Sequence, residues 1–230
     1  MKTPDTVAAA NEFDLWADAG RAESMADGHR GVTEAAIRNW KLDKNSIVLD
    51  VGCGNGWAVQ TLVNMGAGAG VGVDISPRMI ARAKEATASD DRFSFEVSAA
   101  DALPLRDRSI SHLLNVESLY YYPSPELALA EWARVTQPGG SLAIVVDLYE
   151  ENVATHTWID ALDIDVHLLS SPQIVSMAKA AGWSTVSAEQ VLDPRPLTSP
   201  EAFSISKYWP SYEMYVQYRQ TGALVIHAQR

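Results

Sequence analysis

The residues with the clearest chemical potential are two carboxylates and a glycine loop. Three glycines at every second position follow a short apolar run: Gly52, Gly54 and Gly56. Asp50 stands just before them, and Asp74, which ends the next apolar run, stands 20 residues after Gly54. Glycines let backbone N–H groups approach a ligand closely, and a carboxylate at this spacing can accept hydrogen bonds from both ribose hydroxyls of a nucleoside. The pattern predicts a nucleoside-binding site.

The residue at position 57 indicates which of two classes of cofactor this loop fits. A dinucleotide-binding loop follows the pattern G-x-G-x-x-G, whose third glycine would fall at position 57. An indole fits poorly where a glycine is needed for close packing of helix on strand. A nicotinamide-dependent oxidoreductase is therefore disfavoured, and the spacing of Asp74 disfavours a glycine-rich turn without a ligand.

Segment 50–56 has the pattern Asp-x-Gly-x-Gly-x-Gly, which resembles the first motif of the class I S-adenosylmethionine-dependent methyltransferases, of the type 11-like kind. Segment 74–80 resembles its counterpart in that family, where Ile75 would lie against the adenine. The resemblance covers about residues 45–192 and implies S-adenosylmethionine as cofactor, with no metal. It implies the following cofactor-binding residues: Asp50, Gly52, Cys53, Gly54, Gly56, Asp74, Ile75, Ala100, Asp101, Ala102, Asn115, Val116, Arg21 and Met25.

Two later segments depart from motifs of the family. Segment 98–105 resembles the family's G-D-A-x-x-L-P-F, but the adenine-binding aspartate of that motif falls on Ala99. Whether Asp101 or the backbone of Ala100 serves the adenine stays open. Segment 115–118 lacks the (Asn/Asp)-Pro-Pro-(Tyr/Phe) of enzymes that methylate amines of nucleic acid bases, which weighs against that activity.

A base is needed only for some methyl acceptors. The sulfonium of the cofactor already carries an activated methyl group, so the protein must mainly position the acceptor. An amine or hydroxyl acceptor must lose a proton, whereas a carboxylate acceptor need not. The weak candidates for a base are Glu117, Tyr120, His156 and His167. A packing or capping role is the alternative for each of them.

Apolar and aromatic residues ahead of the first expected strand suggest a flap over the cofactor (residues 1–30). Its candidate residues are Trp16, Arg21, Met25 and His29. The alternative is a helix that packs its apolar side on the sheet, and we interpret His29 as a surface or capping residue rather than a base. We expect the acceptor to be enclosed by this flap and by segments 148–169 and 203–218.

The hydrophobic pattern alternates between strands and helices, which predicts an α/β fold. The expected strands are 47–51, 69–74, 93–97, 109–116, 141–147, 183–192 and 223–228, and the clearest expected helices are 77–88 and 125–135. The resemblance implies a Rossmann-like, seven-stranded, mostly parallel sheet with helices on both faces and the last strand antiparallel. We expect a single domain, with a flap and helix (1–44), a cofactor-binding core (45–192) and an aromatic segment with the last strand (193–230).

The composition of the chain limits the kinds of partner and the cellular location that we expect. The chain has 230 residues, 47% of them hydrophobic, and a formal net charge of −11, which disfavours nucleic acid as a partner. Its single cysteine, Cys53, excludes an internal disulfide and provides no metal cluster. Neither an apolar signal core nor a run of the ~20 residues needed to span a bilayer is found, so we expect a cytoplasmic protein without a membrane partner.

These observations predict an S-adenosylmethionine-dependent methyltransferase that transfers a methyl group to a small organic molecule by in-line displacement. A catalytically silent, methyltransferase-like binding subunit is the first alternative. Its usual sign is erosion of the glycine loop or of the ribose carboxylate, and both are intact at Gly52–Gly56 and Asp74. The acceptor and the oligomeric state stay open.

Overall fold

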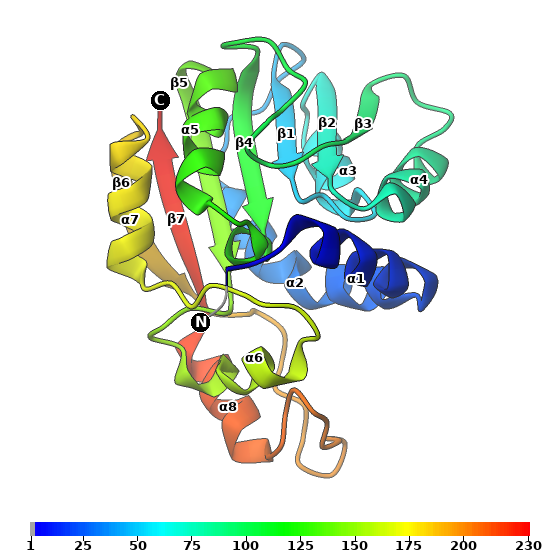
Figure 1. Cartoon of the computed structure of the whole chain (residues 1–230), viewed down its shortest axis with the longest axis vertical. Coiled ribbons are helices and arrows are strands. Elements are labelled where there is room, and N and C mark those ends of the chain that lie inside the picture. Colours follow the sequence, from blue (N-terminus) through cyan, green and yellow to red (C-terminus); the bar gives the residue numbers. More distant parts are fainter. Residues whose placement is uncertain (1–2) are drawn as a thin grey trace.

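The computed structural model describes residues 3–230, whose strands form one seven-stranded sheet (Figure 1). The strands are β1 (Ile47–Val51), β2 (Ala69–Asp74), β3 (Phe93–Val97), β4 (Ile110–Val116), β5 (Thr136–Val146), β6 (Ser184–Val191) and β7 (Ala223–Gln229). Their order is β3-β2-β1-β4-β5-β7-β6. The pairs among β1 to β5 are parallel, and β7 runs antiparallel to β5 and β6 on either side of it. The expected sheet, with its antiparallel last strand, is confirmed.

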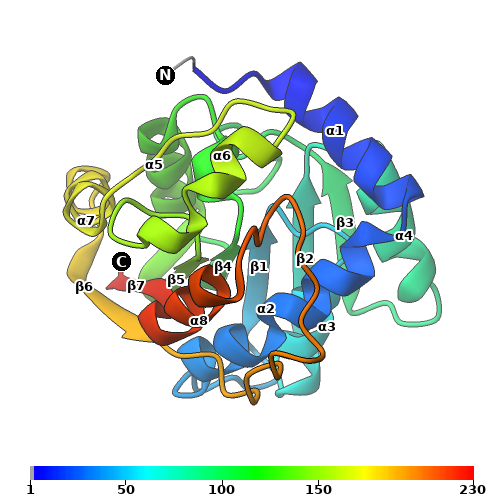
Figure 2. The ribbon, with the colours of Figure 1, turned by 90° about the horizontal axis from the view of Figure 1, so that it is seen from below.

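Helices cover both faces of this sheet, as expected. They are α1 (Thr6–Asp18), α2 (Arg21–Ile37), α3 (Trp57–Asn64), α4 (Pro77–Ala86), α5 (Pro125–Val135), α6 (Thr157–Ala161), α7 (Ser171–Ala180) and α8 (Tyr212–Thr221), with 3-10 turns η1 (Leu119–Tyr121) and η2 (Val153–Thr155). Apolar residues of α2 and α3 pack on one face and those of α5 and α7 on the other, and Figure 2 shows the two pairs on opposite sides of the sheet.

The central strands are buried on both faces because they are apolar at consecutive positions. Val48 and Leu49 of β1 are both fully buried, and they belong to the cores on opposite faces. On α5, Trp132 is fully buried against the sheet. None of the helices in residues 3–230 is long and apolar enough to cross a membrane.

The carboxyl ends of β1, β2, β4 and β5 share one edge of the sheet, because these strands are parallel. In Figure 1 this edge points downward, and α1, α2, α6 and α8 lie below it. Segments from both ends of the chain therefore cover the edge where ligands bind in sheets of this kind.

Most element ends lie within two residues of the expected ones, but one strand start and one helix differ more from the sequence-based expectation. Strand β5 starts at Thr136 rather than at the expected Ser141, because Thr136 already pairs with Ile110 ahead of a register shift between β4 and β5. Helix α8 was not expected in the tyrosine-rich segment. Its signals are present, since Ser211 accepts a hydrogen bond from the N–H of Met214 as its N-cap and Gly222 follows its end.

Candidate active site

The glycine loop borders a cavity at the carboxyl edge of the sheet. Gly52 has a φ of +77°, and a Cβ added there would lie 2.3 Å from Oγ of Ser118. Gly54 has a φ of +52°, but a Cβ added there would meet no atom within 4 Å. The first glycine is therefore required by packing, whereas the second leaves its backbone beside open space, as a ligand cradle needs.

Asp74 anchors this loop and still faces the cavity. Its Oδ2 accepts a hydrogen bond from the N–H of Gly54 at 2.8 Å, and its Oδ1 accepts one from the N–H of Ser76 at 2.9 Å. Burial raises the pKa of Asp74 despite these bonds. An ionised carboxylate has about four acceptor sites, so about two stay free for a ligand.

Asp50 is the least satisfied polar group of the cavity. Its side chain is 2% exposed, and its Oδ1 is buried without a hydrogen bond among the described residues. Burial and the negative charge of Asp74 raise the pKa of Asp50 to about 8. A buried oxygen that lacks a donor fits a ligand that brings a donor or a positive charge.

Most of the expected cofactor-binding residues line this first cavity: Met25, Asp50, Gly52, Cys53, Gly54, Asp74, Ile75, Ala100, Asp101 and Val116. Four do not, namely Gly56, Ala102, Asn115 and Arg21. Gly56 is the N-cap residue of α3, where the ring of Phe95 would lie 2.8 Å from an added Cβ. Ala102 is exposed outside the cavity, and Arg21 lines a second cavity.

Asn115 ties together the ends of β1 and β4. Its buried Nδ2 lies within hydrogen-bond distance of the carbonyl of Val51 at 2.8 Å, of Ser118 Oγ at 2.6 Å and of Tyr122 Oη at 2.9 Å. This network fixes the chain directly after β4. Asn115 therefore shapes the wall of the first cavity from behind.

A second cavity of about 680 Å³ adjoins the first. Its walls come from α1 and α2, from α6, and from segment 193–219, which includes α8. These segments overlap the three regions that we expected to surround an acceptor (1–30, 148–169 and 203–218), but the lining also includes Glu117, Tyr120 and residues 195–198 outside them. Five residues line both cavities: Trp16, Met25, His29, Glu117 and Tyr121.

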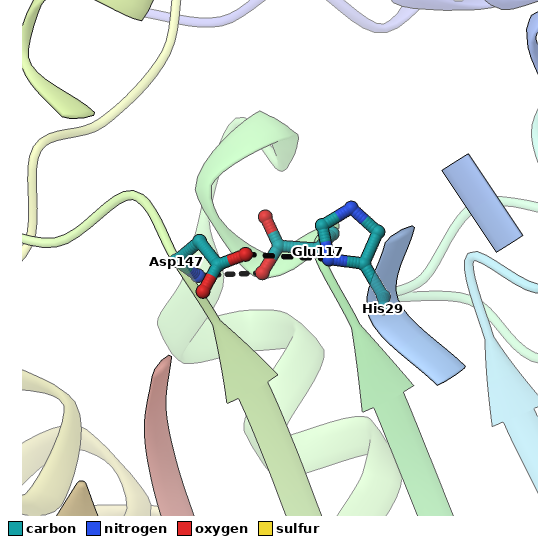
Figure 3. Close-up of side chains that lie close together, drawn as sticks. All are labelled: His29, Glu117 and Asp147. Atoms are coloured by element: carbon teal, nitrogen blue, oxygen red, sulfur yellow. Dashed lines mark hydrogen bonds and ion pairs between the residues drawn. The ribbon is translucent and has the colours of Figure 1, made fainter. Parts of the chain in front are cut away.

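His29, Glu117 and Asp147 form a cluster at this junction (Figure 3). Nδ1 of His29 lies 3.3 Å from Oδ2 of Asp147, and Oε1 of Glu117 accepts a hydrogen bond from the backbone N–H of Asp147. His29 comes from α2, whereas the two acids follow the carboxyl ends of β4 and β5. The interpretation of His29 as a surface or capping residue is wrong, because its side chain is only 19% exposed, lines both cavities and contacts Asp147, which directly follows β5.

Tyrosine hydroxyls complete the cluster. Tyr120 donates to Oε2 of Glu117 at 2.8 Å, and Tyr218 donates to Oδ2 of Asp147 at 2.8 Å. Glu117 also holds a φ of +52°, a left-handed conformation that costs a residue with a Cβ about 1–2 kcal/mol. Strain of this kind persists where surrounding contacts fix the residue, which is common at functional sites.

The cluster holds its protons more tightly than isolated side chains do. Burial and the charge of Asp147 raise the pKa of Glu117 to about 8. Burial by itself lowers the pKa of His29, but the charge of Glu117 and the hydrogen bond that His29 donates to Asp147 outweigh it and raise this pKa to about 9. Both pKa values lie in the range where a group can exchange protons with a phenol or an amine.

The other candidate bases lie outside the junction. Tyr120 lines the second cavity, but burial raises its pKa and its hydroxyl is bound to Glu117. His156 contacts the carbonyl of Glu150, and His167 has a buried Nε2; neither lines a cavity described here. Sequence reasoning missed Asp147, although it ends the expected fifth strand, at the same edge as Asp50.

The fold and the first cavity define a Rossmann-like, nucleoside-binding α/β protein. A family model described as "Methyltransferase domain" matches residues 49–144. A candidate methyltransferase, solved in complex with the Trm112 methyltransferase activator of Haloferax volcanii, superposes with a TM-score of 0.86 at 32% identity, and the match covers 95% of this chain and 97% of that one. This chain belongs to the class I S-adenosylmethionine-dependent methyltransferase family, and S-adenosylmethionine is the methyl donor of that family.

Curated relatives share part of this chain. The methyltransferase GfsG of Streptomyces halstedii is 30% identical over 135 residues, which cover 57% of this chain and 49% of that protein. The 27-O-demethylrifamycin SV methyltransferase of Amycolatopsis mediterranei is 34% identical over 100 residues, which cover 42% of this chain and 37% of that protein. The chain thus matches about half or less of the length of these relatives.

Proposed function

We propose that this chain transfers a methyl group from S-adenosylmethionine, bound in the first cavity, to a small organic molecule bound in the second. The observation that carries this proposal is the junction of the two cavities at His29 and Glu117. A donor and an acceptor in adjoining cavities can be held in line for direct displacement. Such positioning can contribute about 7–11 kcal/mol to lowering the barrier.

The residues of the first cavity fit the parts of this cofactor. Asp74 would accept the ribose hydroxyls with its free lone pairs, and Ile75 and Ala100 would lie against the adenine. The unpartnered oxygen of Asp50 would face the ammonium group, whose charge would lower the raised pKa of this carboxyl. Bound there, the cofactor supplies a methyl group that is already activated.

Binding measurements test the cofactor half of this proposal. Titration calorimetry should show binding of S-adenosylmethionine and S-adenosylhomocysteine, with no added metal, and none of NADH. Binding of NADH alone would contradict it.

A labelling experiment tests the acceptor half. The protein is incubated with methyl-labelled S-adenosylmethionine and a cell extract that is separated by size into small molecules and macromolecules. We expect label to enter the small-molecule fraction only. Label that enters acid-precipitable protein or nucleic acid instead would contradict a small-molecule acceptor.

The complex of the Haloferax volcanii protein supports a second candidate, in which this chain binds an activator protein as part of its function. The proposal is that a Trm112-type activator associates with this chain and raises its cofactor affinity. Co-purification with the Haloferax volcanii activator, followed by calorimetry of the complex, tests it. Separate elution of the two proteins would contradict it.

A further inference from the structure

The junction of the two cavities contains a histidine with one ring nitrogen occupied and the other free. Nδ1 of His29 contacts Asp147, whereas Figure 3 shows Nε2 on the opposite side of the ring. Among the described residues, no protein hydrogen bond to Nε2 is formed. The side chain is 19% exposed and lines both cavities. A ring held by a carboxylate in this way is oriented to exchange a proton at its other nitrogen.

The lining of the second cavity favours a particular class of acceptor. Eight aromatic side chains line it: Trp16, Tyr120, Tyr121, Trp158, Tyr208, Trp209, Tyr215 and Tyr218. Flat aromatic molecules pack well against such walls. The size and walls of the cavity therefore suit an aromatic ring compound.

The charged residues that line the second cavity favour a hydroxyl acceptor over an amine. Three arginines line the second cavity, and Glu117 is the one acidic residue of its described lining. Arg195 and Arg219 pair with Asp193, whereas the guanidinium of Arg21 lies 4.2 Å from the ring centroid of Trp16 and binds the hydroxyl of Tyr208. This positive lining repels an ammonium group and stabilises a phenolate.

We propose, on the basis of the function proposed above, that His29 is the catalytic base for an aromatic hydroxyl acceptor. In the complex the hydroxyl proton of the acceptor resides on Nε2 of His29, which leaves the acceptor oxygen ionised. This oxygen then bonds to the methyl carbon as the carbon–sulfur bond breaks. The sulfonium becomes a neutral thioether, and the imidazolium is paired with Asp147. The proton then passes to solvent before the next turnover.

The protonation state of the cluster of His29, Glu117 and Asp147 agrees with a role of His29 as the base. The titratable and charged groups around His29 are Glu117, Asp147, Tyr120, Tyr218 and Arg195. An ionised acceptor beside protonated His29 carries the same number of protons as a neutral acceptor beside neutral His29. The raised pKa of His29 lies close to the pKa of a phenol. It therefore favours the pair of an ionised acceptor and protonated His29.

The test uses 4-nitrophenol, an aromatic hydroxyl compound whose ionised form is yellow and whose neutral form is colourless. The full chain is saturated with S-adenosylhomocysteine and titrated with this probe below the pH at which free 4-nitrophenol ionises. We expect the bound probe to be yellow, with its pKa lowered by about one unit or more, a factor of about ten in acidity. His29→Gln should bind the probe in its colourless form.

His156→Gln is the matched control, because His156 lines neither cavity and this variant should keep the yellow signal. If His29→Gln fails to fold, Asp147→Asn provides the second variant, and it should reduce the shift. A colourless bound probe in the wild type would overturn the proposal, and so would an unchanged yellow signal in His29→Gln. Absence of probe binding to the S-adenosylhomocysteine complex would overturn it too, while leaving the cofactor assignment intact.

Discussion

The backbone N–H of Gly54 donates a hydrogen bond to Oδ2 of Asp74 at 2.8 Å, which links the glycine loop to the end of the neighbouring strand. The same carboxylate also receives the N–H of Ser76. Asp74 therefore holds the loop and the start of α4 with one lone pair of each oxygen. The structural role and the expected ribose-binding role of Asp74 are compatible, because they use different lone pairs.

The first prediction separates these two roles. Asp74→Ala should weaken binding of S-adenosylmethionine by about 2–4 kcal/mol, or roughly 30- to 1000-fold, since it removes two charge-assisted hydrogen bonds that are not independent. Asp74→Asn should lose less, because its amide oxygen still accepts. Titration calorimetry measures both.

Ser76→Ala is the matched control for Asp74. Its hydroxyl caps α4 by accepting from the N–H of Met79, so this variant should lose about 1 kcal/mol of stability and little affinity. If Asp74→Ala lowered only the melting temperature and kept cofactor affinity within about threefold, the ribose assignment would be wrong.

The second prediction compares two glycines of the loop. Gly52→Ala should destabilise the fold by about 1–3 kcal/mol, because its Cβ would collide with Ser118 at a positive φ. Gly54→Ala should affect cofactor affinity more than stability, because its methyl group would enter the open cavity. Melting curves and calorimetry separate the effects. Gly28→Ala, in α2, meets no neighbour within 4 Å and should leave cofactor affinity unchanged.

The third prediction concerns stability and pH. Folding raises the pKa of Glu117 from 4.5 to about 8, of Asp50 from 3.8 to about 8 and of His29 from 6.5 to about 9. Between about pH 6 and 9 the folded chain thus binds more protons than the unfolded chain, so the free energy of unfolding should fall as pH rises.

Denaturant unfolding across this range measures the slope. An Asp50→Asn, Glu117→Gln double variant should show a flatter decline, whereas Glu34→Gln, at an exposed position of α2, should match the wild type. Stability that rises with pH in the wild type would show that these groups are not buried with their protons.

The fourth prediction concerns the N-terminal flap. Trp16 of α1 and Met25 of α2 line the first cavity, so a bound cofactor would contact both helices. Hydrogen exchange of amides in α1 and in the first turns of α2 should slow when S-adenosylhomocysteine binds. Strand β6, at the far edge of the sheet, should not change. Equal exchange in α1 and α2 with and without the ligand would mean that they are only packed helices.

The sequence by itself determined the parts of this protein that depend on neighbouring residues. The apolar run before Gly52 predicted β1, the glycine spacing and Asp74 predicted a nucleoside site, and the motif at 50–56 carried the resemblance that implied the cofactor. Each depends on local patterns, since a strand, a tight loop or a cap is specified within a few residues. Helix α8 also has local signals, since Ser211 caps its start and Gly222 follows its end, although the sequence analysis did not predict it.

Only the tertiary structure decided which chemistry-bearing residues meet. His29 and Asp147 are far apart in the chain, and they touch because α2 packs across the edge where β5 ends. Tyr218 reaches the same carboxylate from α8. No local pattern encodes such contacts, because they depend on how helices at both ends of the chain fold over one edge of the sheet. Because of that packing, His29 lies between the two cavities rather than at the surface, where the sequence analysis had expected it.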